Sequence, residues 1–202
     1  MNHHPPFPDD ATLWQGFQRG DAQAFETLFR RHYAPLIRYG WKLSHNRMLA
    51  EEAVQSIFSH LWAQRAHLKS IEAVRAYLYT AVRHAVLKEQ LRAGRFHTFA
   101  GEDTSHGAIQ FSQEDALIHE EAHRQKRDQL LAAVNALTPR QREAVYLKFY
   151  ENLSHEEIAA VLHINVQSVT NLIFRAMHLL RQSTPLKRLL ESLCLIGYWI
   201  VS

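Results

Sequence analysis

The sequence predicts an all-α protein of two small helical domains joined by a flexible linker, the C-terminal one a helix-turn-helix. Three observations support this fold class. Apolar residues recur at helical spacing along most of the chain, no alternating runs indicate strands, and residues 96–113 have no period and contain two glycines. The chain has 202 residues, of which 47% are hydrophobic, enough for real hydrophobic cores.

These patterns divide the chain into four parts. We expect an N-terminal domain at residues 10–95, a linker at 96–122, a C-terminal domain at 123–183 and an apolar tail at 184–202. The apolar run of the tail is shorter than the ~20 residues that a membrane span needs. We therefore expect the tail to pack as a last helix, with partner or membrane contact as the alternative.

Helical patterns account for nearly all of the N-terminal domain. Asp9 can cap a first short helix, and Asp21 can cap a second one, in which Pro35 marks a kink or a break. Two longer helices are predicted at 48–65 and 72–93, each with an apolar stripe at the 3.6-residue period.

A helical pattern resumes near Glu114, still within the linker, and runs to Ala136 in the C-terminal domain, and a second helix is predicted at 139–150. The second of these has a clear start, because Thr138 can cap it and Pro139 suits the first helical position. A short connection then leads into the last motif of the domain.

Residues 154–181 have the pattern of a helix-turn-helix. Ser154 and Glu157 have the spacing of a capping box, and Asn165 can cap a second helix. Between them His163 occupies a turn position that often needs a positive φ, which His tolerates at some cost. Such a unit places its second helix in the DNA major groove. The alternative is an ordinary pair of packed helices with polar outer faces.

The second helix of this motif has an apolar and a polar face. We expect burial of its apolar residues, Val166, Val169, Ile173, Ala176 and Leu180. The outward residues are candidates for hydrogen bonds to base edges and phosphates: Gln167, Ser168, Thr170, Asn171, Phe174, Arg175 and His178.

Two other helical faces are candidate interaction surfaces. Helix 72–93 interleaves basic and aromatic residues suited to phosphates and unpaired bases, namely Arg75, Tyr77, Arg83, His84, Lys88 and Arg92. Helix 48–65 has an acid-and-amide face that can dock a basic partner, namely Glu51, Glu52, Gln55, Ser56 and Ser59. The alternative for both is a solvated helix face.

Composition limits the classes of protein and the compartments that fit this chain. The net charge of +3 and the pI of about 9.1 permit nucleic-acid binding. Cys194 is the only cysteine, so no internal disulfide can form, which fits a reducing cytoplasm. The first ten residues lack the basic and apolar regions of a signal peptide, so we expect a cytoplasmic protein.

Motifs of catalysis are missing from the sequence. It contains no glycine-rich phosphate loop, no nucleophile elbow and no HExxH. His119, Glu120 and His123 could hold a metal ion, but a charged and exposed segment without a further ligand at standard spacing is the favoured interpretation. We expect no enzyme activity, no catalytic residue, no cofactor, no metal and no small-molecule substrate.

Taken together, the chain resembles the extracytoplasmic-function (ECF) sigma factors of bacterial RNA polymerase. Four motifs carry the resemblance, in the family's order: GDAQAFETLFRRHYAPLIRY, AEEAVQSIFSHLW, VRAYLYTAVRHAVLKEQLR and LTPRQREAVYLKFYENLSHEEIAAVLHINVQSVTNLIFRAMHLLR. They are similar to the opening helices, the polymerase-binding segment, the promoter-melting helix and the C-terminal domain that reads the upstream promoter element. Ser56 stands where the family usually has an acid, and His84 where it usually has Asn.

The resemblance implies a function in transcription initiation. Core RNA polymerase would bind helix 48–65, the downstream promoter element would be melted on helix 72–93, and the upstream element would be read by the helix after Asn165. Promoter DNA and an anti-sigma factor are the other expected partners. A helix-turn-helix regulator that acts without polymerase is the alternative function, and a pure protein adaptor is a third. The AEEAVQSIFSHLW segment distinguishes them, because a simple regulator has no reason to carry it.

Overall fold

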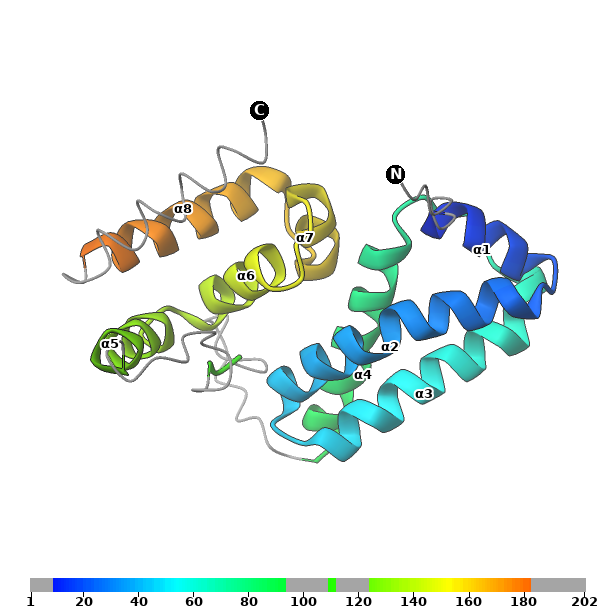
Figure 1. The fold of residues 1–202 in the computed structure, drawn as a ribbon, viewed down its shortest axis with the longest axis horizontal. Helices are drawn as coiled ribbons and strands as arrows, with labels where there is room; N and C mark the ends of the chain where they lie inside the picture. Colours follow the sequence, from blue (N-terminus) through cyan, green and yellow to red (C-terminus); the bar gives the residue numbers. More distant parts are fainter. Residues whose placement is uncertain (1–8, 94–108, 112–123, 183–202) are drawn as a thin grey trace, which may run out of the picture.

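The computed structural model describes residues 9–93, 109–111 and 124–182, and over these residues it contains helices and no strand. The N-terminal bundle comprises α1 (Asp10–Gln18), α2 (Ala22–Ser44), α3 (Arg47–Gln64), the 3-10 turn η1 (Arg65–His67) and α4 (Val74–Arg92). The C-terminal bundle comprises α5 (Arg124–Asn135), α6 (Pro139–Phe149), α7 (His155–Leu162) and α8 (Val166–Gln182). Figure 1 shows the two bundles side by side. The predicted all-α fold class is confirmed.

The helix starts in the N-terminal bundle are set by side-chain caps, as predicted. The Asp9 carboxylate accepts a hydrogen bond from the Thr12 N–H at 2.6 Å, and Asp21 caps α2 in the same way. Gly20 joins the two helices with a φ of 91°, a conformation that favours glycine. The second helix runs through Pro35 without ending, so a break at this residue is excluded.

The bundle core forms where α2 crosses α3 and α4. In Figure 1, α2 and α3 lie side by side along most of their length, and α4 packs against both. Gly40 lies at the crossing, because a Cβ built there would be 3.1 Å from the Ala50 Cβ and 3.2 Å from a Val82 methyl group. The absence of a side chain at Gly40 lets the three helices approach closely.

The C-terminal bundle depends on two capping boxes. Thr138 and Gln141 exchange hydrogen bonds at the start of α6, and Ser154 and Glu157 do so at the start of α7. Helix α8 then packs on both α6 and α7. These contacts confirm the helix starts that the sequence predicts.

Three residues of the predicted linker are described, and two of them are buried. Ile109 is fully buried and Phe111 is 6% exposed, so this part of the linker is packed against protein. The Asn135 side chain pairs with both the N–H and the carbonyl of Phe111, at 3.1 and 3.0 Å. The rest of the predicted linker, 96–108 and 112–122, and the whole predicted tail, 184–202, lie outside the described residues.

The two bundles share a core. Buried side chains of α1 to α4 and of α6 to α8 belong to one contiguous hydrophobic cluster. The most extensive helix contact between the bundles joins α4 to α7. The relative placement of the bundles is therefore part of the fold that positions the candidate sites.

Candidate functional site

The helix-turn-helix is formed by α7, a tight turn and α8. His163 ends α7 with a φ of 52°, which confirms the expected left-handed turn position. The Asn165 side chain then accepts a hydrogen bond from the Ser168 N–H at 2.7 Å, which begins α8. The local hydrogen bonds thus fix the angle at which α8 leaves α7.

The inner face of α8 agrees with the sequence except at its first residue. Val169, Ala176 and Leu180 are buried, and Ile173 is half-buried. The prediction is wrong for Val166, which is 39% exposed. This residue begins the helix directly after the turn, beyond the surface that α6 and α7 cover.

The opposite face of α8 is open to solvent. Six of its predicted residues are exposed and Ser168 is half-buried, the six being Gln167, Thr170, Asn171, Phe174, Arg175 and His178. Gln167 donates to the Asn171 amide oxygen at 3.3 Å, and the Phe174 ring, 70% exposed, stacks with His178. Amides can pair with adenine edges and an apolar ring can contact a thymine methyl group. The face is therefore chemically suited to base contacts.

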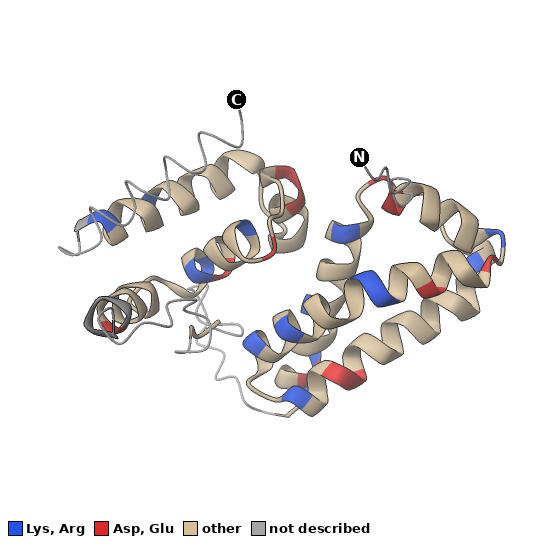
Figure 2. Cartoon of the chain, in the orientation of Figure 1, with Lys and Arg blue, Asp and Glu red and all other residues tan. Residues whose placement is uncertain are grey.

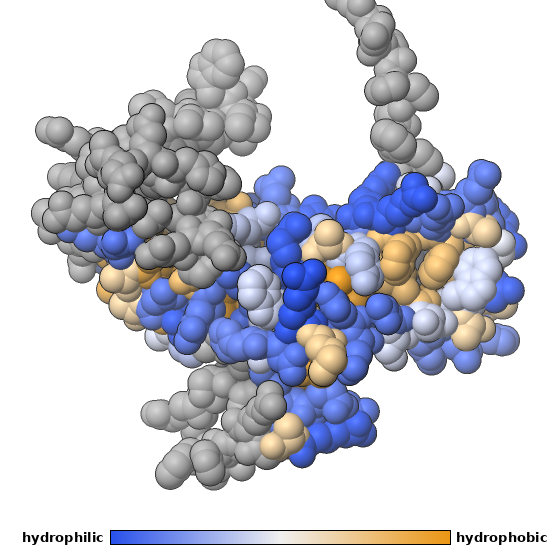
Figure 3. Space-filling model, turned by 60° about the horizontal axis from the view of Figure 1, so that its bottom comes forward, coloured by the Kyte–Doolittle hydropathy of each residue, from blue (hydrophilic) through white to orange (hydrophobic). Residues whose placement is uncertain are grey.

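A second exposed surface lies on α3. Glu52, Gln55, Ser56 and Ser59 are exposed, whereas Glu51 is half-buried and pairs with Arg47 at 2.8 Å. Gln55 and Ser59 also line an open groove together with aromatic residues of α2 and α3, namely Phe25, Phe29, Phe58 and Trp62. Figure 3 shows apolar surface exposed among polar side chains on this bundle, at the right. Aromatic rings beside a polar rim are typical of protein interfaces.

Some predicted residues of the basic helix α4 are exposed to solvent, and others contact the C-terminal bundle. Lys88 and Arg92 are exposed, and Arg92 pairs with Glu89 at 2.8 Å. The Tyr77 ring is 39% exposed and meets the Trp14 ring edge-on, with centroids 5.5 Å apart. The other three predicted residues contact the C-terminal bundle: Arg75, Arg83 and His84.

Glu143 of α6 is buried against the N-terminal bundle. Its Oε1 accepts hydrogen bonds from the Tyr39 hydroxyl at 2.7 Å and from the Arg83 Nε at 2.9 Å. A second Arg83 nitrogen lies 3.4 Å from Oε2, and the two side chains are only 13% and 3% exposed. This two-point pair replaces the water that both charges lose on burial.

Glu151, directly after α6, makes the second acidic contact. Its carboxylate accepts hydrogen bonds from the hydroxyls of Tyr79 and Tyr146, and its backbone carbonyl accepts one from Arg75. Burial, and then the neighbouring carboxylates, raise the pKa of Tyr39 and of Tyr79 well above the ordinary value. Both hydroxyls therefore remain protonated donors to the acids of the other bundle.

A histidine pair lies at the edge of this contact. The Nε2 atoms of His84 and His163 are 2.7 Å apart, and the rings are nearly parallel, at 7°. Burial lowers the pKa of His84, and the charges of His163 and Arg83 lower it further. The pair links the turn of the helix-turn-helix directly to α4.

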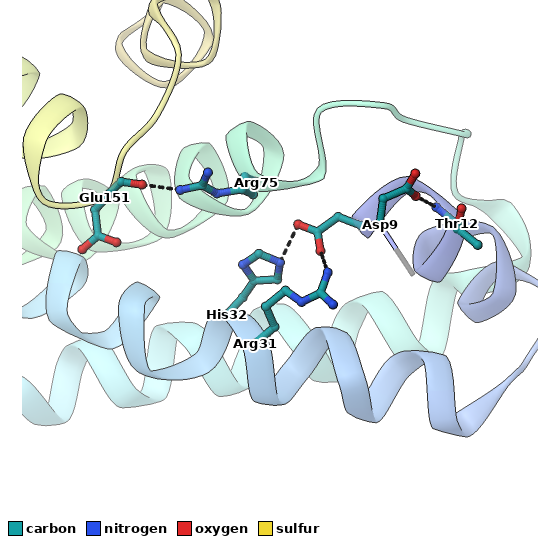
Figure 4. Close-up of polar contacts among 7 residues, drawn as sticks. Asp9, Thr12, Arg31, His32, Arg75 and Glu151 are labelled. Carbon is teal, nitrogen blue, oxygen red and sulfur yellow. Dashed lines mark hydrogen bonds and ion pairs between the residues drawn. The ribbon is translucent and has the colours of Figure 1, made fainter. Parts of the chain in front are cut away.

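A polar network beside the interface joins α1 to α2. The Asp10 carboxylate accepts from Arg31 at 2.5 Å and pairs with His32 at 2.9 Å. Burial alone would raise the pKa of Asp10, but hydrogen bonds and charges from His32 and Arg31 hold it below the ordinary value. Figure 4 shows Arg31 and His32 on α2 and Arg75 reaching Glu151, and these side chains line one pocket.

The sequence gives no indication that acids and tyrosines form this contact. Glu143 is 60 residues from Arg83 and 104 from Tyr39, so no local spacing links them. The one local signal is that Tyr39 shares a helical stripe with Leu36 and Leu43, which are both fully buried. This spacing predicts burial of the tyrosine without indicating a partner.

The candidate metal ligands His119, Glu120 and His123 lie outside the described residues. Within the described ranges, no group of three or more His, Cys, Asp or Glu residues could hold a metal ion. The helices in those ranges are also too short or too polar for any to cross a membrane.

Comparison with known proteins gives two family matches. The family described as Sigma-70 region 2 matches residues 28–96, and Sigma-70, region 4 matches residues 127–180. The chain is 26% identical over 173 residues to the RNA polymerase sigma-H factor of Pseudomonas aeruginosa, which covers 83% of this chain and 89% of that protein. It is 25% identical over 169 residues to the ECF RNA polymerase sigma factor SigL of Mycobacterium tuberculosis, with 82% and 92% covered.

A solved structure has the same fold. The sigma factor RpoE in complex with the anti-sigma factor NepR, from Bartonella quintana, aligns with a TM-score of 0.55 and 19% identity, covering 80% of this chain and 97% of that chain. The α3 and α4 surfaces lie within the region 2 match, and α8 lies in the region 4 match up to residue 180. With both regions present in the order that the sequence motifs predict, the chain belongs to the extracytoplasmic-function sigma factors.

Proposed function

We propose that this chain binds core RNA polymerase and directs transcription initiation at specific promoters, with α3, α4 and α8 as its working surfaces. One observation carries the proposal: α8 exposes a polar face on a helix-turn-helix, and α3 of the same chain exposes a polar face beside an aromatic groove. A regulator acting without polymerase would need only the first. The polymerase performs the chemistry of RNA synthesis, so the chain is not itself an enzyme, and it acts in the cytoplasm.

The outer face of α8 would read the upstream promoter element in the major groove. Gln167 and Asn171 would pair with base edges, and Arg175 and His178 would approach phosphates, since all four are exposed. Few basic residues lie on this helix, so its affinity for DNA alone should be low. Binding of the same chain to polymerase would hold α8 near the promoter and so raise its effective concentration there. The affinity of the whole complex for the promoter would then exceed that of α8 alone.

The face of α4 would hold the melted downstream element. Tyr77 can stack on an unpaired base, and Lys88 and Arg92 can approach phosphates, since all three are exposed. Arg75, Arg83 and His84 would join this surface once the C-terminal bundle leaves it.

The α3 face would bind the polymerase. Ser56 replaces an acid that the family usually has, so Glu52 and Gln55 would make most of the polar contact. The aromatic groove that Gln55 and Ser59 line would add apolar contact area. An anti-sigma factor, the kind of partner present in the similar solved structure, would be a second protein partner.

The test is run-off transcription with core polymerase of the source bacterium, together with gel filtration of the mixture. We expect the double variant Glu52→Arg, Gln55→Arg to lose co-elution and transcripts while its helical circular dichroism is unchanged. Glu26→Arg, an exposed charge reversal on α2, is the matched control and should behave as wild type. Undiminished co-elution of the double variant would exclude α3 as the polymerase surface. Promoter binding without any polymerase-dependent transcript would favour the regulator.

A further inference from the structure

Two histidines from distant parts of the chain meet at one point on the surface. His84 lies on α4, and His163 is the turn residue between α7 and α8, 79 positions later in the sequence. Their ring centroids are 4.7 Å apart but their Nε2 atoms only 2.7 Å, so the two nitrogens face each other. Both side chains are exposed, and imidazole nitrogens are the commonest metal ligands in proteins.

A hydrogen bond alone gives little reason for histidine at these two positions. His163 has a φ of 52°, a conformation that glycine adopts without strain and other residues adopt at a cost. At the position of His84 the ECF sigma factors usually have Asn. One ring can donate to the other, but such a bond between exposed groups adds little stability, because water can replace it. Two unusual residues that converge on one point indicate a shared ligand.

The geometry of the pair is close to that of a two-histidine metal site. Zn–N bonds of about 2.0–2.1 Å at the tetrahedral angle place two nitrogens roughly 3.3 Å apart. The Nε2 atoms of His84 and His163 are 2.7 Å apart, so they would need to separate by roughly 0.6 Å. Small rotations of two exposed side chains can supply this movement. Solvent also reaches the pair, so water can complete the coordination of an ion.

The charges near the pair permit a bound cation. Arg83, next to His84 in the sequence, is paired with the Glu143 carboxylate at 2.9 Å. The helix that ends at His163, α7, carries Glu156 and Glu157 and no lysine or arginine, as Figure 2 shows. Lys88, one turn further along α4, is exposed and can turn its flexible side chain into solvent.

We propose that His84 and His163 together bind one divalent transition-metal ion, such as Zn²⁺, through their Nε2 atoms. Imidazole ligands favour zinc, nickel and copper, whereas Mg²⁺ and Ca²⁺ prefer oxygen ligands. No third His, Cys, Asp or Glu of the described residues joins the pair, so water supplies the other ligands. The ion would connect α4 to the turn before α8. It would stabilise the folded chain, because the unfolded chain does not hold the two rings together.

The test is a Zn²⁺ titration of the full-length chain, followed by NMR of the histidine ring nitrogens and by calorimetry. We expect the Nε2 signals of His84 and His163 to shift together with Zn²⁺ and to stay unchanged with Mg²⁺. His84→Asn and His163→Gly should each weaken Zn²⁺ binding at this site at least about tenfold, since even indirect partners of a metal site contribute that much. His60→Asn, the same change at an exposed histidine of α3, is the matched control and should leave the site intact.

Both variants should fold, because Asn is the usual residue of the family at the first position and glycine suits the backbone at the second. Helical circular dichroism checks this, and Zn²⁺ should raise the Tm of the wild type more than that of either variant. Unshifted His84 and His163 signals in the wild type would overturn the site and leave a hydrogen-bonded pair only. A shift of one ring that persists without the other would overturn shared binding. Neither readout involves DNA or polymerase, so the result is independent of the proposed function.

Discussion

Replacing Glu151 with alanine removes a carboxylate to which buried tyrosines of both bundles donate. Tyr79 donates from α4 and Tyr146 from α6, and Glu151 is only 7% exposed. A hydrogen bond to a charged group contributes about 1.5–3 kcal/mol. Part of the sum for two bonds is offset, because alanine has no charge to desolvate. We expect the free energy of unfolding to fall by about 3 kcal/mol and Tm by roughly 6–12 °C.

Thermal and urea unfolding of the full chain, followed by circular dichroism, measure this loss. Glu156→Ala, which removes an exposed acid from the first turn of α7, is the control and should cost at most about 1 kcal/mol. A double-mutant cycle with Tyr79→Phe should give a coupling energy of about 1–3 kcal/mol, because the two side chains share one hydrogen bond. A loss under about 1 kcal/mol, or no coupling, would refute the assignment of Glu151 as a buried anchor between the bundles.

Three further predictions concern pH, promoter recognition and packing. Burial, and then the charges of His163 and Arg83, lower the pKa of His84 in the folded chain, so the unfolded chain binds more protons there and stability falls as pH falls from the ordinary value of 6.5 through the lowered pKa. The free energy of unfolding in urea should therefore fall between about pH 8 and about pH 5, and it should fall less in His84→Asn than in the wild type; equal falls would exclude His84 as a contributor. Arg175→Ala should weaken binding of the polymerase complex to an upstream-element promoter by about 1–3 kcal/mol in a mobility-shift titration, and unchanged binding would exclude this residue as a reader. Gly40→Ala should lower the free energy of unfolding by about 1–3 kcal/mol despite the better helix propensity of alanine, because its Cβ would lie 3.1 and 3.2 Å from side chains of α3 and α4; equal stability in urea would show that these helices can separate slightly.

Much of the helical architecture could be predicted because its causes are local. The caps at Asp9, Asp21 and Ser154 act on N–H groups within three residues along the chain. The turn at His163 depends on one backbone angle, and the apolar stripes depend on helical periodicity. Such features need no knowledge of the rest of the chain, so helix starts and the helix-turn-helix follow from the sequence.

Burial of charged residues could not be predicted in this way. A sequence pattern treats an acid or an arginine as exposed, since an isolated charge is costly to bury. Glu143 and Arg83 can be buried because each neutralises the charge of the other. The sequence around either residue gives no sign of this partner, so it does not predict the burial. Packing of Ile109 and Phe111 was missed for a related reason, since a segment without periodicity shows no face to bury.

The helices, their caps, the outward face of α8 and the motifs shared with sigma factors could all be predicted, because each depends on residues within a few turns of one another. Only the packed structure shows that Arg75 and Arg83 are partly buried against the other bundle and that the exposed His84 ring contacts His163. Those contacts join residues 60 or more positions apart, and their strength depends on burial that only the packed bundles create. The same side chains are therefore a basic helix face in the sequence and part of a closed interface in the folded chain.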